Sequence, residues 1–264
     1  TSLVRPIADF QANLAGTLNL LEAVRQQPLP PALLFTSTNK VYGDLADVEL
    51  IRTDGRYAPR DADTRTHGIS ERQRLDFHSP YGCSKGAADQ YVLDYARMYG
   101  LRNVVFRMSC IYGQHQFGTE DQGWVAHFAL QLLRGGRLHI YGDGLQVRDL
   151  LYVEDLIRAM LLAMENIDTL AGRAFNIGGG PDHTVSLLEA IRLLSGLSGV
   201  EPRLRYGPPR QGDQPYYVSD TRRFVEATGW MPRVSVEQGI SRLYHWIVEN
   251  VPLGRSVLQP KEYT

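Results

Sequence analysis

The sequence predicts an α/β protein built on a parallel β-sheet, and three stretches support that prediction. Two short apolar runs, residues 32–37 and 103–108, have the continuous hydrophobic character of strands buried on both faces. Between them lies a helical stretch that begins near Ser79 and ends near Gly100. Two strands joined by a helix form a βαβ unit, in which the strands run parallel. The 264 residues suffice for one large domain, or for a domain with a smaller partner.

The stretches around the first strand differ in character. Before it, apolar residues from Ile7 to Leu21 recur at helical spacing, and a proline-rich stretch, residues 28–31, ends that helix. After it comes a long polar segment, residues 44–78, with little periodicity. We expect this segment to be a loop on the surface or over a cleft.

Beyond Gly113 the sequence predicts further helices and strands. A polar connection, residues 114–123, comes first. Helices are expected over residues 124–134, from Glu154, and after the capping boxes Ser186-x-x-Glu189 and Ser235-x-x-Gln238. Strands are expected over residues 137–141 and 146–153, around a glycine turn at 142–144, and over residues 173–177.

Composition excludes several classes of function. A net charge of -1 gives no electrostatic reason to expect nucleic acid or an anionic membrane as partner. No apolar run approaches the roughly 18 residues of a membrane span. Cys83 and Cys110 lack metal or redox spacing, which favours a reducing compartment, and His78 and His115 lack ligand spacing. We therefore expect a cytoplasmic protein with no metal site.

The pair Tyr81-x-x-x-Lys85 is the first candidate for chemistry. Residues four apart on a helix lie one above the other, so the Lys85 ammonium can sit beside the Tyr81 phenol. A neighbouring cation favours phenolate and lowers the phenol pKa toward the working range of a base. The alternative is an ordinary pair on a helix surface, and the pair alone is only moderately specific.

One expected motif is missing from the chain as given. A doubly wound dinucleotide-binding domain opens with a strand, a glycine-rich turn and a helix N-terminus that holds the pyrophosphate. The sequence contains neither G-x-x-G-x-x-G nor G-x-G-x-x-G, and the three glycines at 178–180 come too late.

Taken together, Thr38 after a strand, Tyr81-x-x-x-Lys85 and a strand ending at Arg107 resemble the extended short-chain dehydrogenase/reductase family, in particular its nucleotide-sugar epimerases and dehydratases. The other matching stretches are residues 13–23, 37–43, 148–155, 175–178 and 210–213. The resemblance implies a Rossmann-type doubly wound parallel sheet with a smaller C-terminal α/β substrate domain. It assigns residues 1–112 to the NAD-binding domain and 113–264 mainly to the nucleotide-sugar domain, with part of 147–177 returning to the first sheet.

In that family the fold begins roughly 70 to 80 residues before the position of Thr1, with the strands and glycine-rich turn that hold the adenosine half of NAD. We therefore expect the natural chain to extend further. The alternative is a divergent protein that has lost this part of its cofactor site.

The resemblance implies a catalytic role for three residues. Thr38 matches the residue whose hydroxyl hydrogen-bonds the reacting sugar oxygen, and Tyr81 matches the general base. Lys85 matches the lysine that lowers the tyrosine pKa and binds the nicotinamide ribose. Ser37 and Cys110 match positions beside the cofactor, although a small buried side chain is an equal reading of Cys110.

Four further residues match substrate contacts. Arg148 and Arg210 match the two arginines on the pyrophosphate, for which a planar fork is suited. Asp213 matches a contact to the nucleotide ribose, and Tyr141 matches the residue that stacks on the base. Without the motif context, a solvated arginine and a core tyrosine are the simpler interpretations.

Residues 37–45, 76–91 and 121–125 resemble the CDP-paratose (CDP-tyvelose) 2-epimerases. This implies an NAD-dependent enzyme that oxidises a CDP-sugar to a keto sugar and reduces it again from the other face. A UDP-sugar 4-epimerase or related reductase, and a non-catalytic nucleotide-sugar-binding fragment, remain the alternatives.

Asn39 and Lys40 stand where 4,6-dehydratases carry an acid and a base, which argues against dehydration. Family members pair through the Tyr81 helix, so the resemblance also implies a homodimer with Ala87, Tyr91 and Tyr95 as contacts.

Overall fold

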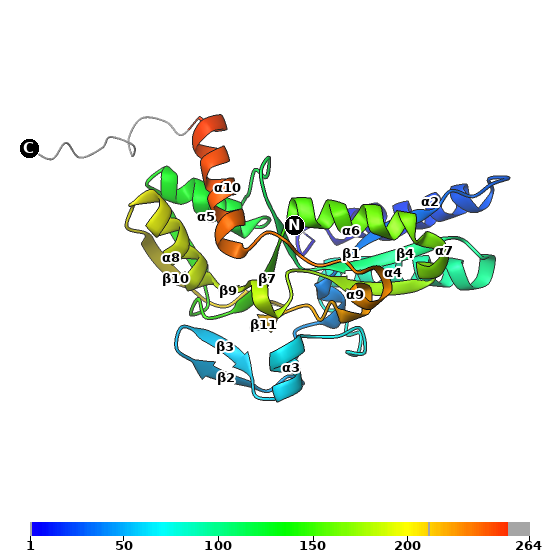
Figure 1. Ribbon diagram of the computed structural model, residues 1–264, viewed down its shortest axis with the longest axis horizontal. Helices are drawn as coiled ribbons and strands as arrows, with labels where there is room; N and C mark the ends of the chain where they lie inside the picture. The colour runs from blue at the N-terminus through cyan, green and yellow to red at the C-terminus, as the bar shows by residue number, and fades with distance from the viewer. Residues whose placement is uncertain (1, 211, 253–264) are drawn as a thin grey trace, which may run out of the picture.

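The computed structural model describes residues 2–210 and 212–252, and its centre is a parallel sheet (Figure 1). The strand order is β1 (Leu33–Thr38), β4 (Asn103–Met108), β8 (Arg173–Ile177). Helix α4 (Ser79–Tyr99) connects β1 to β4, and Leu33 pairs with Asn103 in a parallel register. The βαβ unit predicted from the sequence is therefore confirmed.

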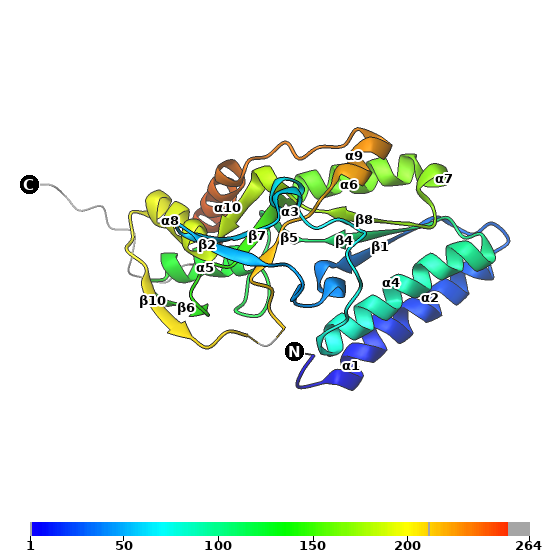
Figure 2. The ribbon, with the colours of Figure 1, turned by 90° about the horizontal axis from the view of Figure 1, so that it is seen from below.

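Helices cover both faces of this sheet (Figure 2). On one face lie α4 and α2 (Gly16–Arg25), and on the other lie α6 (Val153–Glu165), α7 (Ile167–Leu170) and α9 (Arg222–Thr228). Successive residues of β4 alternate between the two layers. Val105 packs in the cluster with α2 and α4, whereas Val104 and Phe106 pack in the cluster with α6 and α9. This explains why the strand is apolar along its length.

The helices of the N-terminal segment pack against helix α4. Helix α1 (Pro6–Phe10) passes through one π-helical turn (Gln11–Ala15) into α2, so the predicted helix is confirmed with a local irregularity. Tyr95 of α4 is buried, and its hydroxyl donates to Glu22 at 2.6 Å. Tyr95 therefore packs within the chain, in contrast to its expected place in an intermolecular contact.

A second lobe is built around β7 (Val147–Tyr152). This strand pairs in parallel with β5 (Cys110–Tyr112) and β11 (Tyr216–Tyr217), and antiparallel with β9 (Thr184–Ser186). Strand β6 (Arg137–Tyr141) pairs instead with β10 (Arg203–Gly207). The two strands predicted on either side of the 142–144 turn are therefore both present, and each pairs with strands from other parts of the chain.

Three helices close the second lobe: α5 (Trp124–Leu133), α8 (Leu187–Ser198) and α10 (Val236–Asn250). Their apolar faces form one buried cluster with β6 and β7. Both predicted capping boxes are present, with Ser186 and Glu189 at α8 and Ser235 and Gln238 at α10. Among the described residues, no helix has the length and hydropathy needed to cross a bilayer.

The polar segment 44–78 is more ordered than predicted. It contains an antiparallel hairpin of β2 (Leu50–Thr53) and β3 (Arg56–Pro59), followed by α3 (Ala62–His67). The turn is Asp54-Gly55, with Gly55 at φ +80°, a conformation that favours glycine. The hairpin lies against the second lobe, where the Tyr57 amide donates to the Leu145 carbonyl at 3.0 Å. Such short strands depend on this docking, so periodicity alone could not reveal them.

Candidate functional site

Thr38 and Tyr81 both lie at the carboxyl edge of the parallel sheet. Thr38 ends β1, and Tyr81 lies in the first turn of α4. Burial raises the pKa of the Tyr81 phenol, and a hydrogen bond with the Thr38 side chain opposes that rise. A hydroxyl and a phenol at this edge are placed where parallel α/β sheets bind ligands.

Lys85 lies one helical turn beyond Tyr81 but has another partner. Its Nζ donates to the Thr36 carbonyl at 2.6 Å and lies 4.4 Å from the centre of the Phe35 ring. The prediction that Lys85 lowers the pKa of Tyr81 is wrong for this structure, in which burial raises that pKa. Burial likewise lowers the pKa of Lys85 itself. The carbonyl of β1 holds the ammonium beside the strand.

Ser37 belongs to a buried network that sequence analysis missed. Its hydroxyl donates to Asp89 at 2.7 Å, and Arg107 donates to both oxygens of the same carboxylate at 3.0 and 2.9 Å. Arg107 also donates to the Tyr42 hydroxyl at 3.2 Å. This network ties α4 to β1 and β4, so the Ser37 side chain supports the site from behind. A lone arginine at the end of an apolar strand was the available signal.

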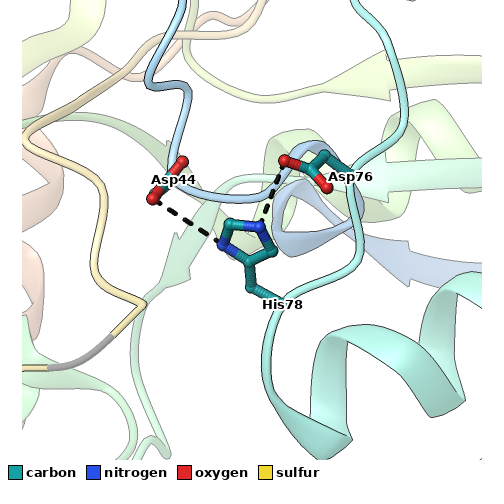
Figure 3. Close-up of side chains that lie close together, drawn as sticks. All are labelled: Asp44, Asp76 and His78. Atoms are coloured by element: carbon teal, nitrogen blue, oxygen red, sulfur yellow. Dashed lines mark ion pairs between the residues drawn. The ribbon is translucent and has the colours of Figure 1, made fainter.

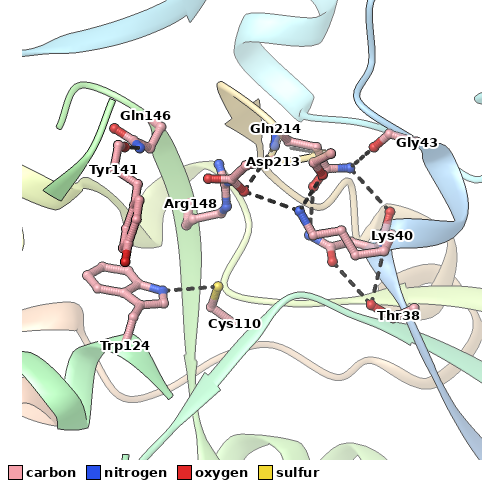
Figure 4. Close-up of polar contacts among 12 residues, drawn as sticks. Thr38, Lys40, Gly43, Cys110, Trp124, Tyr141, Gln146, Arg148, Asp213 and Gln214 are labelled. Carbon is pink, nitrogen blue, oxygen red and sulfur yellow. Dashed lines mark hydrogen bonds and ion pairs between the residues drawn. The ribbon is translucent and has the colours of Figure 1, made fainter. Parts of the chain in front are cut away.

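Arg148 and Asp213 form an ion pair, and Lys40 lies between this pair and Thr38 (Figure 4). The distance from Arg148 Nη2 to Asp213 Oδ1 is 2.7 Å, and Lys40 Nζ lies 3.3 Å from the same oxygen. Burial alone would raise the pKa of the Asp213 carboxyl, but the charges of Arg148 and Lys40 outweigh it and lower that pKa. One carboxylate therefore serves two cations.

Arg210 and Tyr141 form the outer part of the site. The Arg210 guanidinium carbon lies 4.1 Å from the centre of the Tyr141 ring, a cation–π contact. Arg210 also donates to the Glu120 carbonyl at 3.0 Å, and the Tyr141 hydroxyl donates to the Glu120 side chain. That hydrogen bond lowers the pKa of Glu120. The aromatic ring and the arginine thus lie together at one rim.

Cys110 lies among these groups, at the start of β5. The indole nitrogen of Trp124 donates to its sulfur at 3.5 Å. Burial raises the pKa of the Cys110 thiol, which disfavours a reactive thiolate. Cys110 therefore contributes shape and apolar surface.

Asn39 and Gln214 join the Thr38 segment to the Asp213 segment. Asn39 Nδ2 donates to Gln214 Oε1 at 3.3 Å, and Gln214 Nε2 donates to the Gly43 carbonyl at 2.6 Å. Gln214 is fully buried, and its backbone N–H donates to Asp213 at 3.0 Å. No local sequence pattern links residues so far apart, so this connection could not be foreseen.

His78 connects the two segments that carry Thr38 and Tyr81 (Figure 3). Its Nε2 lies 3.1 Å from Asp76 and its Nδ1 lies 3.7 Å from Asp44. The three side chains are close enough to offer ligands to one metal ion, a grouping that sequence spacing did not indicate. However, the two ring nitrogens face different carboxylates, an arrangement that ion pairing satisfies. We therefore interpret His78 as a bridge between the two segments.

One cavity adjoins the site and another lies apart from it. One of about 320 Å³ is lined by Asp213, Asp44 and apolar residues of the segment before β2. The other, of about 540 Å³, lies between the hairpin and helices α8 and α10, away from Thr38 and Tyr81. The smaller cavity adjoins the site through Asp213.

The reactive half of a nicotinamide cofactor fits the groups at the carboxyl edge. A phenol, a hydroxyl and an ammonium, from Tyr81, Thr38 and Lys85, lie at or beside the end of β1. These donors match the hydroxyls of a ribose and the oxygen of an alcohol undergoing oxidation. The donor set is consistent with the ribose and nicotinamide end of a dinucleotide cofactor, which Tyr81, Thr38 and Lys85 would hold.

Comparison with known proteins agrees with this arrangement. The family described as "NAD dependent epimerase/dehydratase family" matches residues 1–178. The CDP-paratose 2-epimerase of Salmonella typhi is 46% identical over 251 residues, which cover 93% of this chain and 73% of that protein.

Two solved structures show the same fold. UDP-glucose 4-epimerase of Thermotoga maritima, solved with UDP-glucose, is 31% identical with a TM-score of 0.79, and the match covers 95% of this chain and 74% of that one. UDP-glucose 4-epimerase of Thermus thermophilus, solved in complex with NAD, is 30% identical with a TM-score of 0.78 and the same coverage.

Proposed function

Because the chain belongs to the NAD-dependent epimerase/dehydratase family, we propose that it epimerises a CDP-sugar at C2 of a deoxyhexose. The observation that carries this proposal is the placement of Thr38 at the end of β1 and of Tyr81 in the first turn of α4, with Asn39 and Lys40 directly after Thr38. The 46% identity to a CDP-paratose 2-epimerase supports the choice of cytidine nucleotide and of C2.

The proposed reaction has two symmetrical halves. When bound, NAD would accept a hydride from the sugar carbon and later return it. Tyr81 takes the hydroxyl proton of the sugar in the first half and gives it back in the second. Thr38 hydrogen-bonds the same oxygen, and Lys85 holds the nicotinamide ribose. The keto sugar would turn over between the halves, so that Tyr81 and Thr38 would act on the same oxygen with the other face of the carbon presented for reduction, and bound NAD would be regenerated.

The nucleotide must stay bound while the sugar turns. Arg148 and Arg210 provide guanidinium forks for the diphosphate. Asp213 accepts from the ribose, and Tyr141 offers a ring for the base. Binding energy at these fixed parts of the substrate then holds the sugar near Tyr81 in both orientations.

Dehydration does not fit the residues after Thr38. Elimination of water needs an additional acid and base beside the sugar. Asn39 is held by Gln214, and Lys40 carries an ammonium in contact with Asp213. Neither side chain offers the carboxyl chemistry that elimination requires, which supports epimerisation.

We also infer the division of the chain and its assembly. Residues 1–112 together with β8 form the NAD-binding side, and most of residues 113–264 forms the sugar-nucleotide side. An apolar surface on α1, α2 and α4 supports a homodimer through the Tyr81 helix. Tyr91, with 42% of its surface exposed, and Ala87 lie on that helix.

Replacing Tyr81 with Phe tests the proposal. The protein chain is assayed with CDP-paratose and NAD, and the epimer formed is separated by chromatography. Loss of the proton acceptor should reduce kcat by roughly 100-fold or more, while the dissociation constant for CDP stays the same. Tyr99→Phe, at the far end of the same helix, is the matched control.

Three outcomes contradict parts of the proposal. Unchanged turnover in Tyr81→Phe removes Tyr81 from the reaction. Preference of the unmodified chain for a UDP-sugar identifies the 4-epimerase alternative. This chain is structurally similar to solved UDP-glucose 4-epimerases. Binding of CDP-sugars without any turnover identifies the non-catalytic alternative.

A further inference from the structure

Lys40 lies between the catalytic segment and the segment that holds the nucleotide. It belongs to the short turn Asn39–Tyr42, and its backbone N–H donates to the Thr38 hydroxyl at 3.2 Å. Its side chain reaches across the site, where Nζ lies 3.3 Å from Asp213 Oδ1 and 3.4 Å from the Gly212 carbonyl (Figure 4). The backbone of Lys40 thus adjoins Thr38, and its ammonium lies beside Asp213.

The ammonium is held loosely. Both of its hydrogen bonds are longer than the usual 2.7 to 3.2 Å for nitrogen donors. Its acceptor, Asp213 Oδ1, receives a shorter bond of 2.7 Å from Arg148 and another of 3.0 Å from the Gln214 amide. Burial and then the charge of Arg148 lower the pKa of Lys40, while Asp213 opposes them. A better acceptor entering the site would draw the ammonium away from Asp213.

The position of Lys40 favours the sugar over the diphosphate. Asp213 lies between the ammonium and Arg148, so Lys40 is on the Thr38 side and Arg148 on the far side (Figure 4). Thr38 ends β1 and Tyr81 lies in the first turn of α4, and these are the residues at which the alcohol is oxidised in the proposed function. The side chain is 29% exposed, enough to meet a ligand without leaving its place.

We propose that Lys40 donates a hydrogen bond to the sugar oxygen of the keto intermediate and holds that oxygen while the sugar turns over. This inference rests on the proposed function. It adds a residue that positions the keto intermediate between the two halves of the reaction. When the oxygen leaves Thr38 and Tyr81, it is a carbonyl and accepts hydrogen bonds only. Leaving that oxygen unpaired away from water costs free energy.

An ammonium is suited to this task. It has three donors and no acceptor, and its four-carbon stem is flexible, so it follows an oxygen between two positions. Lys40 keeps its proton throughout. The balance of the reaction is therefore unchanged, with the hydride exchanged with NAD and the hydroxyl proton exchanged with Tyr81.

The test compares Lys40→Met and Lys40→Arg with the unmodified chain. Three quantities are measured: kcat for epimerisation, keto sugar released into solution, and the dissociation constant for CDP alone. Lys40→Met preserves length but removes the charge, so we expect kcat to fall roughly 10- to 100-fold. Released keto sugar should increase, because the intermediate is held less well. Affinity for CDP should change less than about twofold, which also shows that the variant is folded.

The control and the opposing results are distinct. Lys40→Arg should recover part of kcat because it restores a donor cation. Arg25→Met, which removes a surface cation paired with Glu22, should leave all three quantities unchanged. An unchanged kcat in Lys40→Met overturns the inference, and so does a parallel loss of CDP affinity, which would assign Lys40 to the diphosphate. Absence of CDP-sugar turnover in the unmodified chain would instead contradict the proposed function itself.

Discussion

The Thr38 side chain influences the pKa of Tyr81, the group that we propose as general base. Burial raises the pKa of the Tyr81 phenol, and the hydrogen bond with Thr38 partly offsets the rise. A base acts in its deprotonated form, so the active fraction of Tyr81 increases as pH rises toward that raised pKa. Turnover limited by proton transfer should accordingly increase from neutral to alkaline pH.

Thr38→Val removes the opposing hydrogen bond and keeps the shape of the side chain. The acid limb of the profile of kcat/KM against pH should move to higher pH, because the Tyr81 pKa rises further. Thr169→Val, which alters an exposed hydroxyl on α7, is the control and should leave the profile in place. A limb that stays fixed or moves to lower pH would show that Thr38 does not act on Tyr81.

Asp89 carries the buried charge behind the site. Asp89→Asn leaves Arg107 without its carboxylate in the interior, which should lower the free energy of unfolding by about 3 to 5 kcal/mol. Urea denaturation at neutral pH measures the loss, and Asp94→Asn on the exposed side of the same helix is the control. A loss no greater than in the control would mean that water reaches Arg107.

Single residues divide clearly between those that sequence could identify and those it could not. Tyr81 and Lys85 follow from their spacing on a helix, and Thr38 follows from the resemblance to a known family. Their interactions did not follow, since the partner of Lys85 is the Thr36 carbonyl on another element. Gln214 has no local pattern, and only the tertiary structure brings it to Asn39.

At the scale of elements, the β2–β3 hairpin fastens the first lobe to the second. Arg56 donates to Glu189 at 3.0 Å through Nε and to the Thr184 hydroxyl at 2.9 Å. The long strands and capped helices were predictable from periodicity and caps. The hairpin was not, because its strands are short and are stabilised by contacts with α8 and β9 that no local pattern contains.

Arg56→Ala should weaken that attachment by about 1 to 2 kcal/mol at neutral pH, since the pair is partly screened by solvent. Burial alone would raise the pKa of Glu189, but hydrogen bonds from Arg56 and the Ser186 backbone lower it overall. A lowered carboxyl pKa gives stability that is present above the unfolded-state pKa and is lost as pH falls through the folded-state pKa.

The stability difference between Arg56→Ala and the unmodified chain should therefore shrink in the acid range, below the ordinary glutamate pKa. Urea denaturation at several pH values measures it, with Arg52→Ala on the neighbouring strand as control. A difference that is independent of pH would mean that Arg56 acts through packing alone.

For the whole molecule, the exposed apolar side chains on α1, α2 and α4 are the feature that bears on assembly. Tyr91 and Met98, one heptad apart on α4, are 42% and 65% exposed, and Ile7 and Leu20 on the neighbouring helices are 70% and 53% exposed. Exposed apolar side chains gathered on neighbouring helices are typical of subunit interfaces. We expect the double variant Tyr91→Glu, Met98→Glu to sediment as a monomer and the unmodified chain as a dimer.

Leu161→Glu provides the control for that experiment. Leu161 is 58% exposed on α6, which covers the opposite face of the sheet. It should leave sedimentation unchanged. A monomeric unmodified chain, or equal sedimentation of the double variant and the unmodified chain, would contradict a dimer through α4.

The return of β8 to the first sheet determines the order in which the molecule can be made. Strand β4 ends at Met108 and its outer partner β8 begins only at Arg173, after the chain has passed through α5, β6, β7 and α6. During synthesis the central sheet therefore stays incomplete until much of the second lobe has emerged. Contacts so distant in sequence are slow to form, and neither lobe can finish folding as an independent unit. We therefore expect the two lobes to fold and unfold together in one cooperative transition.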